Sequence, residues 1–201
     1  MFSKRPSVQI LAGSITAQAV QLLAYPIVAR WIGPEHFGIY FAIAGAITVI
    51  IAIGTLQLEG ATLAFPDRYS DLILHAAFHS LCVVALLTGI GALLCYVFIS
   101  HLSTRAELVP GLAYLPIGVL LHGLYALGIA GSVRKKQFHR IGQAHLTLSI
   151  TTAVAQVVSG YLGSELIGLL LADACARIIG LSRLSLPRLA ITLRCARRSL
   201  R

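Results

Sequence analysis

Six stretches almost free of formal charge make up most of this chain of 201 residues, and each approaches the length that crosses a lipid bilayer. A helix rises about 1.5 Å per residue, so about 20 apolar residues span a hydrocarbon core of about 30 Å. Because lipid cannot satisfy exposed backbone groups, such segments are helical. We therefore predict an all-α fold, a polytopic membrane helix bundle with six transmembrane helices within residues 1–184. The predicted spans cover residues 8–29, 37–64, 72–99, 111–133, 141–162 and 166–182.

The composition excludes the common classes of soluble and disordered protein. Hydrophobic residues make up 57% of the chain and charged residues 11%, whereas a soluble domain has about 25% charged residues. A net charge of +9 on a soluble domain favours nucleic acid as a partner. Here the basic residues lie between apolar segments, which is a pattern of membrane topology. We predict contact with membrane lipid and no nucleic-acid partner.

Lys and Arg residues are distributed unevenly between the two sides of the predicted bundle. With a cytoplasmic N-terminus, 13 of them lie in cytoplasmic segments, two (Arg30 and Arg105) lie on the opposite side, and Arg177 lies inside a span. This bias orients helices in a membrane, so we predict that both termini are cytoplasmic. Residues 185–201 place leucine on one helical face and arginine opposite. They are predicted to form a basic amphipathic tail on the anionic leaflet, the alternative being a basic terminus without fixed structure.

Four of the predicted spans carry polar side chains at intervals of three, four or seven residues, which places each set on one helical face. Polar groups avoid lipid, so we expect these faces to turn inward. They then either form hydrogen bonds between helices or line a water-accessible cavity, and the sequence leaves both interpretations open. The rows are Ser14, Gln18, Gln21 and Tyr25; Thr48, Thr55, Glu59 and Thr62; His75, His79 and Cys82; and His145, Ser149, Thr152, Gln156 and Ser159.

Charged residues at membrane depth are functional candidates, because an unpaired charge at mid-bilayer costs about 3 kcal/mol or more. Asp173 and Arg177 are four residues apart and can pair on one face, with a self-neutralising pair as the structural alternative. Arg30 ends the first span, where it can also extend to the interface. We predict that the substrate pathway is formed by Arg30, Glu59, Gln18, Gln21, Tyr25, Gln156, Asp173 and Arg177.

The motifs of small membrane enzymes are missing from the sequence. The segment Asp173–Arg177 superficially resembles the signature of CDP-alcohol phosphotransferases, but it lacks the glycine, and no carboxylate follows Asp173. Cys82, Cys95 and Cys175 have no metal-ligand spacing, and we expect them to be small buried hydrophobic residues. With seven acidic residues in all, no metal-carboxylate cluster is formed. We predict a protein that is not an enzyme, with no catalytic residue, no metal and no cofactor.

The segment Tyr25–Gly38 reads Y-P-I-V-A-R-W-I-G-P-E-H-F-G. It resembles the first loop of the Wzx-like polysaccharide flippases, the polysaccharide-transport family of the multidrug/oligosaccharidyl-lipid/polysaccharide (MOP) exporter superfamily. The basic loop 134–140 and the segment 159–180 are similar to the same family. The residues that match its first-loop pattern are Arg30, Gly33, Pro34, Glu35, Phe37 and Gly38.

This resemblance implies one half of a MOP/MATE-like transporter fold in the bacterial inner membrane. Members of the family flip a lipid-linked oligosaccharide for polysaccharide or lipopolysaccharide biosynthesis, and their cavity is often cationic, which makes Arg30 and Arg177 the candidates here. The alternatives are an exporter of another amphiphile, of the multidrug MOP type, and a structural membrane protein that transports nothing.

Family members have two helix bundles, whereas six spans supply one, and one bundle cannot rock against another alone. The sequence leaves three explanations: a truncated chain, a half-transporter that forms a homo-oligomer, and a half that pairs with a separately encoded second half.

We predict that Arg30→Ala reduces glycan export at an unchanged level of protein in the membrane, because Arg30 lies at membrane depth within the matching motif. The measurement is surface polysaccharide per unit of membrane-inserted protein. Normal export by this variant would remove Arg30 from the substrate pathway.

Overall fold

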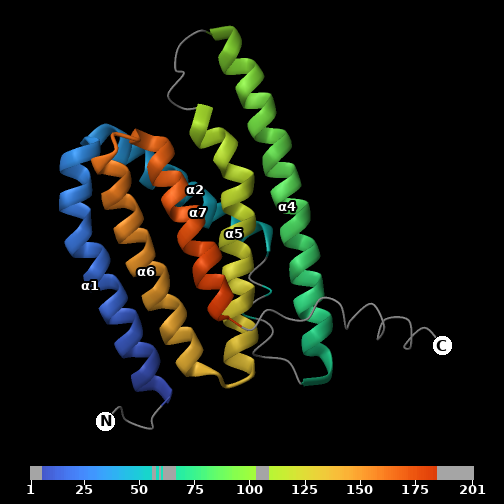
Figure 1. The fold of residues 1–201 in the computed structure, drawn as a ribbon. Coiled ribbons are helices and arrows are strands. Elements are labelled where there is room, and N and C mark those ends of the chain that lie inside the picture. The colour runs from blue at the N-terminus through green and yellow to red at the C-terminus, as the bar shows by residue number, and fades with distance from the viewer. Residues whose placement is uncertain (1–5, 56–57, 59, 61–66, 103–108, 185–201) are drawn as a thin grey trace.

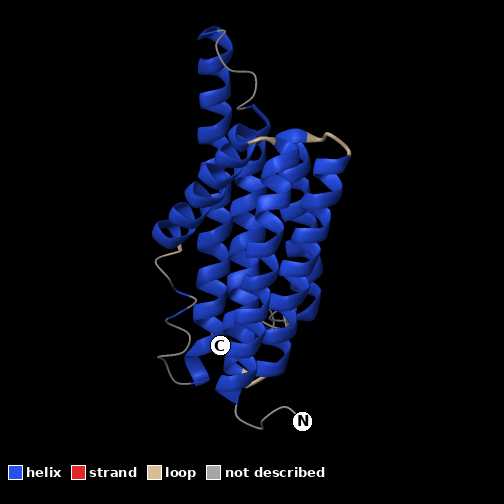
Figure 2. Cartoon of the chain, turned by 90° about the vertical axis from the view of Figure 1, so that its left-hand side faces the viewer, coloured by secondary structure: helices blue, strands red, loops and turns tan. Residues whose placement is uncertain are grey.

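The computed structural model describes residues 6–55, 58, 60, 67–102 and 109–184, and all regular structure within them is helical (Figure 2). The predicted all-α bundle of six helices is confirmed. The helices are α1 (Pro6–Ile32), α2 (Pro34–Gly54), α4 (Asp67–Leu102), α5 (Val109–Arg134), α6 (Phe138–Tyr161) and α7 (Glu165–Arg183).

The order of the helices in space differs from their order along the chain. Packing runs from α1 to α6, α7, α5 and α4, and α2 lies across α5 and α7 (Figure 1). The first and fifth of the six helices are therefore direct neighbours. Because the helices alternate in direction, α1 begins and α7 ends at the same end of the bundle.

A single residue separates α1 from α2. Gly33 has a φ of +91°, a backbone conformation that side chains with a Cβ rarely adopt. Pro34 then opens α2, where its fixed φ suits the first helical turn and its missing N–H costs nothing. This Gly-Pro pair, part of the first-loop pattern, is what turns the chain sharply between two long helices.

Small residues bring α1 and α6 into close contact. A Cβ built on Gly13 would lie 2.9 Å from the Cα of Gly142, so the two backbones touch. Ala17 and Ala24 follow Gly13 on the same buried face of α1, and Val28 completes it with no exposed surface. In membranes, such small residues promote helix association through van der Waals contact.

This packing face displaces the polar row of α1 from the interface. Gln18 is exposed, so the expectation that the whole row turns inward is wrong, while Ser14, Gln21 and Tyr25 are half-buried at the flank of the contact. The physical reason is that Gly13 and its neighbours permit a closer approach than glutamine side chains do.

The other polar rows divide in the same way. On α6, Ser149, Thr152, Gln156 and Ser159 are buried as expected. On α2, Thr55 is buried, but Thr48 is exposed and donates to the Ala44 carbonyl of its own helix at 2.9 Å. On α4 the expectation is wrong for two residues, since His79 and Cys82 face outward. The side chains of Glu59 and Thr62 and the predicted tail 185–201 lie outside the described residues.

The outer surface of the bundle is strongly apolar. Leu86, Leu87, Leu93 and Leu94 of α4 are 60–66% exposed, as expected for a helix in contact with lipid. Cys82, Cys95 and Cys175 are exposed on this kind of surface too, so the expectation that they are buried is wrong. Thiols are small and weakly polar, and lipid therefore accepts them as readily as a protein core does.

Among the described residues, three stretches are long and apolar enough to cross a membrane: 34–54, 72–98 and 109–134. On α6 and α7, by contrast, polar residues interrupt the apolar sequence, and Ser149, Gln156 and Asp173 are among those that are buried. With its 36 residues, α4 is about 54 Å long, so it exceeds a hydrocarbon core of about 30 Å and extends past its neighbours (Figure 1).

We predict that Gly13→Ala lowers the free energy of unfolding by about 1–3 kcal/mol, because its methyl group meets the backbone of α6 and not a flexible side chain. The matched control is Gly45→Ala in α2, where a Cβ meets no atom within 4 Å. The control is expected to gain about 0.5–1 kcal/mol from its higher helix propensity. Unfolding by SDS in mixed micelles measures both, and equal stability of the two variants would contradict close packing of α1 on α6.

Candidate functional site

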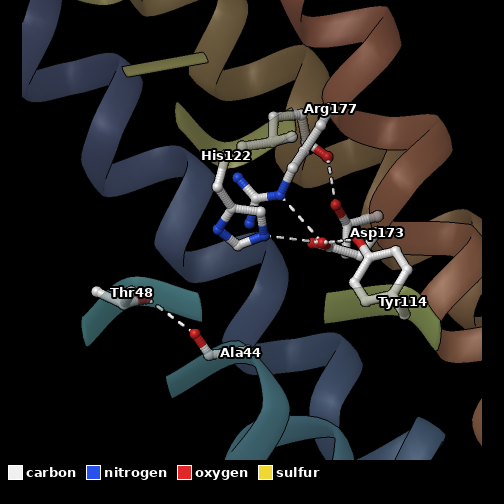
Figure 3. A network of polar contacts seen from close by, with 8 residues as sticks. Ala44, Thr48, Tyr114, His122, Asp173 and Arg177 are labelled. Carbon is white, nitrogen blue, oxygen red and sulfur yellow. Dashed lines mark hydrogen bonds and ion pairs between the residues drawn. The ribbon is translucent and has the colours of Figure 1, made fainter. Parts of the chain in front are cut away.

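The carboxylate of Asp173, at the middle of α7, is the centre of a polar network (Figure 3). Its Oδ2 atom accepts three hydrogen bonds, from Tyr114 Oη at 2.7 Å, from His122 Nε2 at 3.0 Å and from Arg177 Nε at 3.0 Å. Tyr114 and His122 belong to α5, whereas Arg177 follows one turn later on α7. The network therefore joins two helices through one oxygen atom.

The network lies inside the bundle. The side chains of Asp173, His122 and Arg177 are 7%, 12% and 17% exposed. A buried carboxylate is stable only when charge and hydrogen bonds compensate its lost hydration, and here Arg177 supplies the charge. The ion pair follows from the spacing of four residues, as the sequence suggested.

Most of the N–H donors of Arg177 are not bonded to Asp173. A guanidinium carries five N–H groups, and only Nε is used on Asp173. Its terminal amino groups form no hydrogen bond within the described part of the chain, and none of them is both buried and unpartnered. The planar arrangement of these amino groups suits a phosphate or carboxylate group.

A second set of polar groups adjoins Asp173 from α6. The side chain of Gln156 has no exposed surface, and neither amide atom has a hydrogen bond of good geometry in the described residues. Tyr40 of α2 faces this amide and lies within electrostatic reach of Asp173. The hydroxyl of Ser159, one turn along α6, is also buried and unpartnered among the described residues. Gln156 thus belongs to the same polar region as the ion pair.

The predicted residues of α1 are only partly brought to this region. Tyr25 lies within electrostatic reach of Asp173 and donates to Gln21 Oε1 at 3.4 Å. Gln18 is exposed on the outside of the helix. Arg30 is exposed at the end of α1, where it lines a shallow depression with three other residues. Those three are Pro26, Ile27 and Trp31.

The structure therefore brings together Asp173, Arg177, Gln156 and, at the edge, Tyr25 and Gln21. It leaves Gln18 and Arg30 elsewhere, and Glu59 lies outside the described residues.

Three residues of the network were missed from the sequence: Tyr114, His122 and Tyr40. Tyr114 and His122 are eight residues apart, so they do not form a row with intervals of three or four. The available signal was His122 itself, the one histidine in the otherwise uncharged span 111–133.

A second histidine lies apart from the network. His145 of α6 lies with its Nδ1 atom 3.4 Å from the Tyr125 hydroxyl of α5, and it is half-buried. No carboxylate within the described residues forms a hydrogen bond with it. This pair offers a natural comparison with His122.

Comparison with known protein families gives one match. The family described as polysaccharide biosynthesis protein matches residues 27–196 of the chain. The matched range contains the matching residues of the first-loop pattern and every residue of the Asp173 network except Tyr25 and Gln21 at its edge. No curated protein and no solved structure matched the chain.

We predict that Asp173→Asn lowers the free energy of unfolding by roughly 3 kcal/mol, because it leaves the Arg177 guanidinium without a counter-charge. The control is Glu165→Gln, which removes a carboxylate that is 72% exposed and is expected to cost less than about 1 kcal/mol. The double variant Asp173→Asn/Arg177→Gln is expected to recover part of the loss. If Asp173→Asn and Glu165→Gln were equally stable, the contacts of Asp173 would not stabilise the fold.

Proposed function

Since this chain belongs to the polysaccharide biosynthesis protein family, we propose that it transports a lipid-linked oligosaccharide between the two leaflets of the bacterial inner membrane. The family is of the transporter type and is not a class of enzymes. The chain is a membrane protein with a role in polysaccharide biosynthesis. Within that role we propose the flipping of the lipid-linked glycan, and the polar groups in the interior of the bundle support this step.

The observation that carries this proposal is the Arg177 side chain. It lies within the helix bundle, donates to Asp173 through Nε, and has further donors that form no hydrogen bond within the described part of the chain. A diphosphate is the charged part of the lipid carriers used by the family that the first loop resembles. Arginine binds phosphate oxygens in a bidentate manner, which supplies both affinity and orientation.

We place the N- and C-termini on the cytoplasmic side. The excess of Lys and Arg in the segments on that side supports this orientation. The arrangement in Figure 1, with α1 beginning and α7 ending at one end of the bundle, is compatible with it. The substrate then enters from the end of the bundle that holds the α5–α6 turn.

We propose further that the transport pathway forms between this bundle and a second one, either a second copy or a separately encoded half. Alternating access requires two bodies that move against each other. Exposed Gln18 on the apolar outside of α1 supports a protein neighbour there, because lipid offers its amide no hydrogen bond.

We predict that Arg177→Gln reduces flipping of a fluorescent lipid-linked oligosaccharide in proteoliposomes by about tenfold or more, because a charge-assisted contact contributes about 1.5–3 kcal/mol. The control is Arg183→Gln, an exposed arginine in the last turn of the same helix, which is expected to keep full activity. Surface polysaccharide in cells that lack the native chain gives the second readout.

Equal activity of the Arg177→Gln and Arg183→Gln variants would exclude Arg177 as a substrate contact. Export of cationic amphiphiles without any flipping of the glycolipid would favour the multidrug-type alternative.

A further inference from the structure

The turn between α5 and α6, residues 135–137, concentrates positive charge on the surface of the bundle. Lys135 and Lys136 are exposed in the turn, and Arg140 is exposed just beyond it. Residues 108–164, which include both helices, contain no aspartate or glutamate. Within the described part of the chain, none of the three cations forms an ion pair with a carboxylate. Their charges are therefore available to an anion from outside the bundle.

Lys136 has a backbone conformation that favours glycine. Its φ is +55°, its N–H donates to the Val133 carbonyl at 2.9 Å, and the N–H of Gln137 donates to the Ser132 carbonyl at 2.9 Å. These two bonds are the Schellman motif that ends many helices. Glycine is the usual residue at the left-handed position, because a Cβ raises the free energy of that conformation. Lysine therefore occupies a position where glycine would hold the same turn at lower cost.

The first turn of α6 departs from a second local preference. It contains His139 and Arg140 but no acidic residue, and the side chain of Gln137 forms no capping hydrogen bond. The N-terminus of a helix carries a partial positive charge, which favours anions and disfavours cations. Both departures place basic side chains at the same spot. Local strain that the surrounding structure maintains indicates a function, and here the function is that of the charge itself.

The turn lies at the depth of the lipid headgroups. With 26 and 24 residues, α5 and α6 are about 39 Å and about 36 Å long, whereas the hydrocarbon core is about 30 Å thick. The ends of both helices therefore emerge from the core into the headgroup layer. The negative charge of that layer comes from anionic lipids, which attract basic segments next to membrane-spanning helices.

We propose that Lys135, Lys136 and Arg140 form a binding site for the headgroup of an anionic phospholipid in the leaflet at this end of the bundle. Charge complementarity selects the ligand. A phosphate diester with no cationic group gains from all three side chains, whereas the ammonium group of a zwitterionic lipid is repelled by them. This inference goes beyond the proposed function, because the site serves a lipid that is not transported.

The experiment measures binding of lipid to the full chain in neutral detergent micelles, where no charged bilayer surface contributes. Native mass spectrometry compares phosphatidylglycerol with phosphatidylcholine of the same acyl chains. We expect phosphatidylglycerol to bind more tightly, and Lys135→Gln and Arg140→Gln each to weaken its binding by about fivefold. The matched control is Arg183→Gln, which removes an exposed arginine in the last turn of α7 and is expected to keep the native affinity.

The variant Lys136→Gly separates charge from strain. Glycine adopts a positive φ without cost, so this variant is expected to unfold at a higher SDS fraction than the native chain. Its affinity for phosphatidylglycerol is expected to fall by about fivefold, because the charge is lost. Lys135→Gly removes the same charge where φ is not positive, and it is expected to unfold at a lower SDS fraction. Helical content by circular dichroism shows that each variant is folded.

The outcomes separate this site from its alternatives. Equal binding of the two phospholipids, or native affinity in folded Lys136→Gly and Arg140→Gln, overturns the site. An equal loss in Arg183→Gln overturns it as well, because the overall charge of the chain would then explain the binding. Displacement of phosphatidylglycerol by an equal concentration of farnesyl diphosphate would assign the turn to an isoprenoid diphosphate and overturn its assignment to a phospholipid. Lower stability of Lys136→Gly would contradict the strain at Lys136, and with it the argument that the charge is kept for a ligand.

Discussion

The buried charge of Asp173 is the constraint on which the arrangement of this bundle depends. A carboxylate in a medium of low dielectric constant needs partners at fixed distances, and those partners come from two helices. The axial positions of α5 and α7 are therefore fixed relative to each other. The apolar core then closes around this pair, with Ile47 of α2, Leu81 of α4 and Val119 of α5 fully buried.

Polar and apolar contacts stabilise different pairs of helices in this molecule. Apolar packing alone does not drive helices together in lipid, since lipid chains are as apolar as leucine. Close contact between Gly13 and Gly142 joins α1 to α6, and hydrogen bonds to Asp173 join α5 to α7. A substitution that adds a side chain at Gly13 disturbs the first contact. A substitution that removes a polar side chain disturbs the second.

The features that follow from local spacing could be predicted from the sequence. The six helices follow from long apolar segments, and the pair Asp173–Arg177 follows from an interval of four residues. The partners Tyr114 and His122 could not be predicted, because they depend on which helix packs against α7. The polar row of α1 was a misleading signal, since the neighbouring row of small residues permits a closer approach and forms the interface.

The spatial order of the helices has a consequence for biogenesis. The main neighbour of α1 is α6, which begins more than a hundred residues after α1 ends. At synthesis rates of about 5–20 residues per second, α1 waits roughly 5–20 s in the bilayer before synthesis of this partner begins. During that interval Gly13 and the other small residues of α1 have no α6 to pack against, and α1 is held in place mainly by its own hydrophobicity. A membrane insertase that holds helices without their partners during this delay would therefore act most strongly on α1, and completion of the bundle is a late event in synthesis.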